Sequence, residues 1–422
     1  MNKGIKLRQK IHNVLFDIYK SNITIDKAYY KNKVDSFSSR DIAFINTVCL
    51  NTMRYLFHCK QIINLYVRKK SKLHENILFY SAITQIVFLD FKDYAVINST
   101  VEISKKFRVY HGFINATLKK IALDKTKLKN KKIDFNKLPI WFRKNTNNLS
   151  KKEKDQFLSF FCEEPNLHLV FKNNNYLKNF EEEIFKTSEV SGFLKDKKII
   201  ETIPSFKRGN WWVQDYSSSF PLININENII NEPCIDLCAA PGGKSFQVLA
   251  QKKKIILNDK NKKRIGLIKS NLNRLRFDAE IINYDLENLK LKNKYKFIIL
   301  DAPCSSIGTI RKNPEIFFKE KQPDLDNLIK LQKKMLDVAA SILEKNGIIL
   351  YMVCSFFKVE TIDQIKNFLK RNNEFTQYDF SLNKNNLYNK DFIKNNFMLT
   401  LPNKVSRYNI DGYFAAYLRR KK

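Results

Sequence analysis

Two cysteines and an aspartate stand directly after apolar segments that are typical of buried strands. Residues 297–300 are followed by Asp301 and Cys304, and residues 348–353 are followed by Cys354. The carboxyl ends of parallel strands meet at one edge of a sheet, where ligands bind, so these three side chains are expected to lie together. A thiolate is a strong nucleophile, and a polar group beside it stabilises developing charge. The grouping therefore predicts covalent catalysis by one of the two sulfurs.

The reaction that this set suits is methylation of C5 of cytosine, a carbon that is a poor nucleophile by itself. A thiolate that adds at C6 makes C5 electron-rich, and the adduct must later lose the C5 proton and expel the sulfur. Asp301 suits a role in base recognition, because hydrogen bonds to N3 and the exocyclic amine stabilise the charge that forms during addition. One of the cysteines, Cys304 or Cys354, would attack, and the other would assist release.

A cofactor that contains adenosine is predicted beside the two cysteines. The turn after the first apolar run carries Gly242 and Gly243, which let the backbone approach a ligand closely before a helix begins. Asp259 closes the second run, in the position of an acid that takes ribose hydroxyls, and Asp285 closes the third. A phosphate-binding P-loop is not favoured, because Cys238 stands where that motif needs glycine.

The elements that position these residues alternate between strand and helix. Short apolar runs separated by helical patterns are the signature of βαβ units. They predict an α/β Rossmann-like domain, with a mostly parallel sheet and helices on both faces. The apolar runs lie at residues 235–237, 254–257, 280–283, 297–300 and 348–353, and the helical patterns at residues 262–275 and 328–343.

The rest of the chain divides by composition into further segments. Apolar residues recur at three- and four-residue spacing at Leu7, Ile11, Val14, Leu15 and Ile18, which predicts a helix with a buried stripe. The same spacing recurs from Ile42 to Leu56, after a possible N-cap at Ser38 and Ser39, and the two stretches predict an all-α domain. Trp211 and Trp212 are expected to pack in a core rather than to stack on bases. The expected segments are an all-α domain at 1–125, a basic linker at 126–150, a small α+β domain at 151–225 and the catalytic domain at 226–422.

Charge and cysteine usage narrow the class of protein further. Lys and Arg number 76 against 42 Asp and Glu, a net charge of +34 that favours nucleic acid as the partner, although a biased genome composition would also enrich lysine. No apolar run reaches the length of about 18 residues that a membrane span needs. The seven cysteines form no C-x-x-C pair, which argues against a metal site and favours a reducing cytoplasm. We expect a cytoplasmic monomer with no membrane segment and no metal.

Several motifs together resemble a known family, the RNA 5-methylcytosine methyltransferases of the Nop/Sun type. The resemblance implies a NusB-like, RNA-binding all-α domain, S-adenosylmethionine as the cofactor and a cytosine of 16S rRNA as the substrate. It also makes Cys354 the nucleophile and gives Cys304 the release role. The motifs are Ser39-Arg40-Asp41, Val213-Gln214-Asp215, the segment 236–244, Asp301 to Ser305 with Gly308 and Arg311, and Asp411 to Phe414. The implied cofactor contacts are Cys238, Ala239, Ala240, Pro241, Gly242, Gly243, Lys244, Asp259, Asp285 and Asp301.

The sequence departs from the family pattern in one region and leaves alternatives open. Val353 stands where the family has threonine, and Val359-Glu360-Thr361 stand where it has Glu-Glu-Asn. The alternatives are a 5-methylcytosine methyltransferase for tRNA or 23S rRNA, a DNA enzyme in which Cys304 attacks, and a non-catalytic RNA-binding assembly factor. The joint presence of Asp301, Cys304 and Cys354 argues against the non-catalytic reading.

Overall fold

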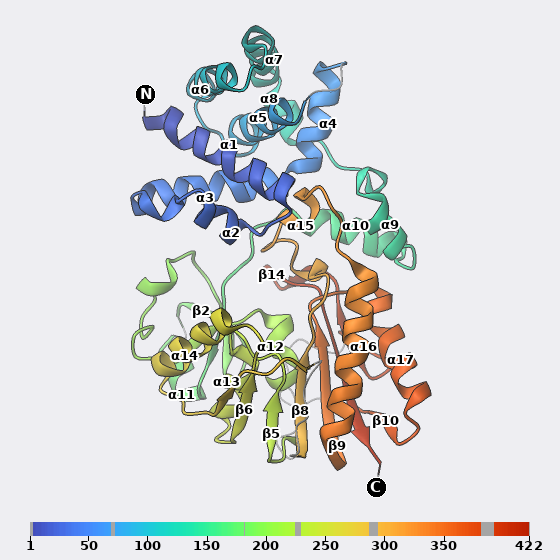
Figure 1. Cartoon of the computed structure of the whole chain (residues 1–422). Coiled ribbons are helices and arrows are strands. Elements are labelled where there is room, and N and C mark those ends of the chain that lie inside the picture. The colour runs from blue at the N-terminus through green and yellow to red at the C-terminus, as the bar shows by residue number, and fades with distance from the viewer. Residues whose placement is uncertain are drawn as a thin grey trace. The chain divides into compact units, whose positions relative to one another are not determined.

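The described residues form two compact units (Figure 1). The first unit comprises Met1–Glu163 together with Ile310–Pro323, and the second comprises Glu164–Thr309 and Asp324–Lys422. A short segment from the C-terminal half of the chain therefore belongs to the first unit. The computed structural model describes residues 3–68, 72–180, 182–223, 229–286, 294–380 and 392–421.

The first unit is helical, as the apolar spacing predicted. Ser38 caps the third helix, because its hydroxyl accepts a hydrogen bond from the amide of Asp41 at 3.3 Å. The predicted apolar stripe is buried on the first helix at Leu7, Ile11, Val14, Leu15 and Ile18. The elements are α1 (Lys3–Ser21), α2 (Ile25–Lys31), η1 (Val34–Ser36), α3 (Ser39–Arg54), α4 (Leu56–Tyr66), α5 (Leu73–Ile83), η2 (Thr84–Phe88), α6 (Asp93–Lys106) and α7 (His111–Leu123).

The segment expected to be a basic linker is instead a folded part of the helical unit. Phe142 of this segment is fully buried against Phe157, with ring centroids 4.9 Å apart, and Phe157 itself comes from the start of the expected α+β domain, residues 151–163 of which also belong to the helical unit. Phe317, from the segment Ile310–Pro323, packs edge-on against Phe142 with a centroid distance of 5.1 Å. Helices of five or six residues are too short to display an apolar stripe, so their lysines dominated the sequence pattern. The elements here are α8 (Lys125–Lys129), η3 (Phe135–Lys137), α9 (Ile140–Asn145), α10 (Lys151–Phe160) and α15 (Glu315–Phe318).

The second unit begins with a small antiparallel sheet of strand order β2-β3-β1-β4. Trp211 is fully buried and Trp212 is 3% exposed, so the prediction that both tryptophans pack in a core is confirmed. The indole N–H of Trp211 is satisfied by the carbonyl oxygen of Pro204 at 2.8 Å. The elements are β1 (His168–Phe171), α11 (Asn174–Lys178), β2 (Ile184–Ser188), β3 (Ser191–Leu194), η4 (Ile200–Thr202) and β4 (Trp211–Val213).

A larger sheet carries the predicted βαβ pattern. Among the described residues it has nine strands, in the order β11-β12-β15-β9-β8-β5-β6-β7, with β10 beside β15. The neighbours in the part β9-β8-β5-β6-β7 pair in parallel. Strand β15 lies beside β9 and pairs with it antiparallel. The strands are β5 (Cys234–Asp236), β6 (Ile255–Asn258), β7 (Ile281–Ile282), β8 (Tyr295–Asp301), β9 (Leu343–Val353), β10 (Phe375–Tyr378), β11 (Ile393–Lys394), β12 (Phe397–Thr400) and β15 (Tyr413–Arg420).

Helices cover both faces of this sheet, as expected (Figure 1). Successive side chains of a strand point to opposite faces, and accordingly Cys234 and Ile235 belong to two different apolar clusters. The cluster with Cys234 includes residues of α12, α13 and α14, and the cluster with Ile235 includes residues of α16 and α17. The helices are α12 (Tyr216–Ile223), α13 (Gly243–Ala250), α14 (Lys262–Leu275), α16 (Leu325–Ile342) and α17 (Ile362–Arg371). Strands β13 (Asn403–Val405) and β14 (Tyr408–Ile410) form a separate antiparallel hairpin.

Candidate active site

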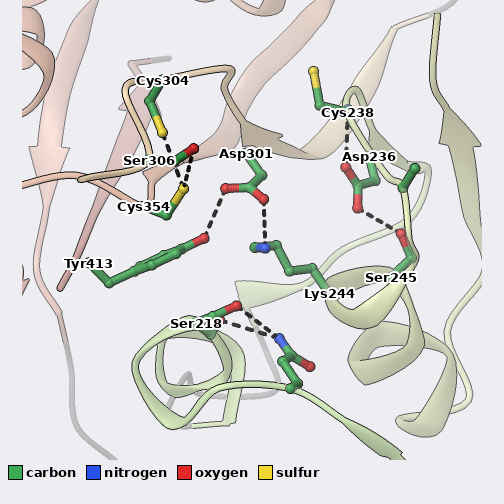
Figure 2. Close-up of polar contacts among 12 residues, drawn as sticks. Ser218, Asp236, Cys238, Lys244, Ser245, Asp301, Cys304, Ser306, Cys354 and Tyr413 are labelled. Carbon is green, nitrogen blue, oxygen red and sulfur yellow. Dashed lines mark hydrogen bonds and ion pairs between the residues drawn. The ribbon is translucent and has the colours of Figure 1, made fainter. Parts of the chain in front are cut away.

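The two cysteines meet at the carboxyl edge of the parallel sheet. Strands β8 and β9 pair in register, with Asp301 opposite Met352, so the loops that follow them start side by side. The Sγ atoms of Cys304 and Cys354 lie 3.3 Å apart, and Ser306 Oγ lies 3.4 Å from Cys354 Sγ (Figure 2). The sequence prediction that the two sulfurs come together is therefore confirmed.

The surroundings of the two thiols make them unequal. The hydrogen bond from Cys304 lowers the pKa of the Cys354 thiol below its ordinary value, against the effect of burial, and Ser306 and Lys244 act in the same direction. The hydrogen bond to Cys354 raises the pKa of Cys304 well above the ordinary value, helped by burial and by the charge of Glu360. Because the thiolate is the nucleophilic form, this asymmetry favours Cys354 as the attacking sulfur.

Asp301 occupies the centre of the site, between a cation and a phenol. Lys244 Nζ lies 2.6 Å from one carboxylate oxygen, and the hydroxyl of Tyr413 donates a hydrogen bond of 2.8 Å to the other (Figure 2). Burial opposes the charge on Lys244, but the hydrogen bond and charge of Asp301, together with the charges of Asp236 and Cys354, outweigh it and raise the pKa of the lysine. The Nζ of Lys244 also stands 5.6 Å from the centre of the Tyr413 ring. These contacts fix the orientation of the Asp301 carboxylate.

The turn after β5 is built around the buried side chain of Asp236. The Asp236 carboxylate accepts hydrogen bonds from the amide of Cys238 at 3.2 Å and from the hydroxyl of Ser245 at 2.7 Å. Burial raises the pKa of Asp236 to about 7. Gly242 has a φ of +115°, and a Cβ atom there would come within 2.1 Å of the Phe246 ring. Glycine is therefore required at this position for both its conformation and its size.

A cavity of about 320 Å³ lies next to the two cysteines. Asp259 lines this cavity, and the residue is 2% exposed. Its carboxylate accepts a hydrogen bond of 3.3 Å from the amide of Ala240 and forms an ion pair of 3.4 Å with Arg264. Carboxylate and amide groups beside apolar side chains suit a nucleoside-like ligand. The lining residues are Leu237, Cys238, Asn258, Asp259, Lys260, Arg264, Tyr284, Leu286, Asp301, Ala302, Pro303, Cys304, Ser306, Met335 and Cys354.

The predicted cofactor residues divide into two groups. Cys238, Asp259 and Asp301 line the cavity, whereas Asp285 is exposed and stands between two lining residues without lining it. The remaining predicted residues form the turn and the start of α13 and are not among the lining residues; they are Ala239, Ala240, Pro241, Gly242, Gly243 and Lys244.

Four residues in or beside this site were not predicted from the sequence. Tyr413 and Ser306 contact Asp301 and Cys354, Arg264 pairs with Asp259, and Glu360 joins the two cysteine loops. The only sequence signals were the motif that contains Tyr413 and the departure from the family pattern around Glu360. Neither signal assigns a contact, because Tyr413 comes from a strand far along the chain and the side chain of Glu360 reaches back to the loop after β8.

The mostly parallel sheet and the glycine turn after β5 are the arrangement of Rossmann-like methyltransferases. Comparison with known families agrees with this class. Residues 224–419 match the family described as 16S rRNA methyltransferase RsmB/F, and residues 6–123 match the NusB family. The C-terminal part of the chain, residues 224–419, is therefore similar to the RsmB/F family of methyltransferases.

Curated relatives and solved structures are similar to the whole chain or to part of it. The Ribosomal RNA small subunit methyltransferase B of Shewanella oneidensis is 28% identical over 390 residues, which cover 87% of this chain and 90% of the relative. The protein of the same name from Photorhabdus laumondii is 34% identical over 180 residues, 42% of each chain. The crystal structure of PH0851 superposes with a TM-score of 0.70 at 20% identity, covering 100% of this chain and 99% of that one. The crystal structure of NSun6 from Pyrococcus horikoshii with SFG superposes with a TM-score of 0.56 at 16% identity. The superposition covers 68% of this chain and 99% of that one.

None of the helices in the described ranges is long and apolar enough to cross a membrane. No group of three or more histidine, cysteine, aspartate or glutamate side chains within those ranges is arranged to hold a metal ion.

Proposed function

We propose that this protein methylates C5 of a cytosine in 16S rRNA, with S-adenosylmethionine as the methyl donor and Cys354 as the nucleophile. The observation that carries the proposal is the pair of sulfurs 3.3 Å apart, of which Cys354 has the lowered pKa. The names of the curated relatives, Ribosomal RNA small subunit methyltransferase B, supply the substrate class.

In the proposed reaction the Cys354 thiolate adds to C6 of the cytosine, which makes C5 nucleophilic. After C5 has gained its methyl group, loss of the C5 proton returns the electron pair of the C–H bond to the ring. This elimination breaks the bond between sulfur and C6 and regenerates the thiolate. Cys304 assists the release, since its sulfur lies 3.3 Å from that of Cys354. Asp301, held by Lys244 and Tyr413, recognises the polar edge of the base.

The residues around the cavity fit S-adenosylmethionine. A buried carboxylate, Asp259, suits the ribose hydroxyls, and Cys238 from the turn after β5 lines the same cavity. The bound cofactor would supply an electrophilic methyl group. A structural neighbour, NSun6 from Pyrococcus horikoshii, was solved with SFG, a methyl-donor analogue. Asp285 remains a proposed contact, although its side chain is exposed.

RNA is the proposed partner, and the charge of +34 supports it. A surface with this excess of lysine and arginine attracts phosphate backbones and releases condensed counterions when it binds them. The NusB-family match at residues 6–123 is the proposed RNA-binding part.

The proposal is tested with unmodified RNA made by transcription. Purified protein and labelled S-adenosylmethionine are incubated with 16S rRNA, 23S rRNA or tRNA, and 5-methylcytosine is mapped by mass spectrometry. One labelled cytosine in 16S rRNA is expected, and Cys354→Ser should abolish the label. Cys49→Ala, which removes a buried thiol of the helical unit, is the matched control and should retain it. Label in tRNA or 23S rRNA alone would refute the assigned substrate, and label with Cys354→Ser would refute the nucleophile.

A further inference from the structure

A buried carboxylate lies directly behind the two cysteine loops. Glu360 ends the 3-10 turn η8 (Lys358–Glu360), which follows the Cys354 loop, and its side chain is fully buried. Burying a charged group is costly unless hydrogen bonds compensate. Glu360 does not line the cavity beside the cysteines, so its burial has a cause other than contact with a ligand there.

The contacts of Glu360 join the loop after β8 to the loop after β9. One carboxylate oxygen accepts from the amide of Ser305 at 2.8 Å and from Gln332 Nε2 at 3.1 Å. The other oxygen accepts from the hydroxyls of Ser305 at 2.5 Å and Ser355 at 2.6 Å. Ser305 and Ser355 each follow one of the two cysteines in sequence. Glu360 therefore ties both cysteine loops to a single anchor.

Every one of these partners donates a hydrogen to the carboxylate. An ionised carboxylate is a pure acceptor, so four donors match the charged form and leave no oxygen that needs a proton. Gln332 also donates to the carbonyl oxygen of Pro303 at 2.9 Å, which fixes the start of the Cys304 loop. The arrangement places a negative charge behind the loop of Cys304.

Charged and titratable groups face the sulfur pair from several elements. Lys244 from α13 attracts negative charge on Cys354, whereas Asp301 from β8 opposes it. The charge of Glu360 acts on Cys304 and raises the pKa of that thiol. The other groups of this surrounding are the phenols of Tyr351 from β9 and Tyr413 from β15.

We infer that Glu360 is a positioning residue that holds the two cysteine loops together and, by its charge, keeps the shared proton on Cys304 so that Cys354 is the thiolate. The inference deepens the proposed function, because it explains how the chain selects its nucleophile. It concerns the free protein, and it is measured without RNA or cofactor. The alkylation result therefore does not depend on whether the protein methylates 16S rRNA, and the methylation result does not depend on the role of Glu360.

The choice of thiolate is measured by limited alkylation. The full-length protein is treated briefly with iodoacetamide over a series of pH values, and the modified cysteine peptides are counted by mass spectrometry. In the wild type, Cys354 should be modified in clear preference to Cys304 near neutral pH. Equal labelling of the two, or preference for Cys304, would overturn the inference without any variant having to fold.

Glu360→Gln isolates the charge from the anchoring contacts. The amide oxygen can keep the bonds from the Ser305 amide and from Gln332, and the amide NH2 can donate to the two serine hydroxyls once these rotate. The ratio of Cys304 to Cys354 labelling should rise about tenfold, the ratio that corresponds to one pKa unit. Glu360→Asp, which keeps the charge, should stay close to the wild type.

The matched control is Glu315→Gln, which neutralises a buried glutamate of the helical unit. It should leave the labelling ratio unchanged. A folded Glu360→Gln protein with the wild-type ratio at every pH would overturn the charge role. A shift of equal size in Glu315→Gln would show that any buried glutamate has the same effect, and would overturn it as well.

Discussion

Cys304 and Cys354 are 50 positions apart in the chain, and their Sγ atoms are 3.3 Å apart in the fold. Their loops follow adjacent parallel strands, so the contact is a direct result of the β8–β9 pairing. The two sulfurs lie within hydrogen-bonding distance of each other, but their electrostatic surroundings differ. The pKa values of the two thiols therefore shift in opposite directions. A pair of this kind is suited to a reaction in which one sulfur attacks and the other assists departure.

The division of labour between the sulfurs predicts different fates for two variants. Cys304→Ala should still attack and methylate RNA but stall before release, and so accumulate a covalent protein–RNA species. Cys354→Ala should form no such species. Denaturing electrophoresis of each variant with transcribed RNA and S-adenosylmethionine measures the adduct. Its appearance with Cys354→Ala and absence with Cys304→Ala would mean that the roles are reversed, as in the DNA-type mechanism.

Asp259 is expected to contribute to cofactor affinity. Replacement by alanine removes a carboxylate that lines the cavity and holds the Ala240 amide, and should weaken S-adenosylmethionine binding by about 1–3 kcal/mol. Isothermal titration calorimetry gives the affinity directly. Asp278→Ala, an exposed aspartate after α14, serves as the control and should bind normally. Unchanged affinity in a folded Asp259→Ala protein would contradict the assigned cofactor site.

Asp236 should make stability depend on pH. Burial raises the pKa of Asp236 to about 7 in the folded protein, against about 3.9 in an unfolded chain. Between these two values the folded state binds more protons than the unfolded state, so the free energy of unfolding falls as pH rises through that window. Asp236→Asn removes the charge and still offers Ser245 an acceptor.

Thermal unfolding at about pH 5 and about pH 8 measures this effect. The melting temperature of Asp236→Asn relative to the wild type should increase from the lower to the higher pH. Asp337→Asn, an exposed residue paired with Arg371, is the control and should show a smaller change. A difference between Asp236→Asn and wild type that stays constant with pH would rule out the elevated pKa.

Phe317 is expected to stabilise the helical unit, although it lies between two catalytic elements in the sequence. Its ring contacts Phe57, Trp141 and Phe142 at centroid distances of 5.4, 5.8 and 5.1 Å. Phe317→Ala should cost about 3–5 kcal/mol, as for other buried aromatic rings. Hydrogen exchange should accelerate in α9 and α10, and an exposed control, Leu267→Ala, should leave exchange there unchanged. Unaltered exchange in Phe317→Ala would show that the segment does not support this unit.

The local pattern of the sequence was sufficient for much of the fold. Helix α14 begins and ends at the predicted residues, Lys262 and Leu275, because its apolar spacing and its Asn261 cap are encoded within the segment itself. The end of β9 at Val353 was predicted for the same reason, and β8 ends at Asp301, one residue beyond the predicted run. Once those strands are parallel neighbours, the meeting of Cys304 and Cys354 follows from the geometry of a parallel sheet.

Contacts between distant segments decided the rest. Strand β15 brings Tyr413 to Asp301, and the segment Ile310–Pro323 leaves the catalytic region to join the helical unit. No local pattern encodes such packing, because burial depends on what another part of the chain supplies. The same holds for the unequal pKa values of the two thiols, since hydrogen bonding, desolvation and neighbouring charge exist only in the folded environment. The sequence thus determined which residues gather at the sheet edge, and only the tertiary structure decided which sulfur is set to lose its proton.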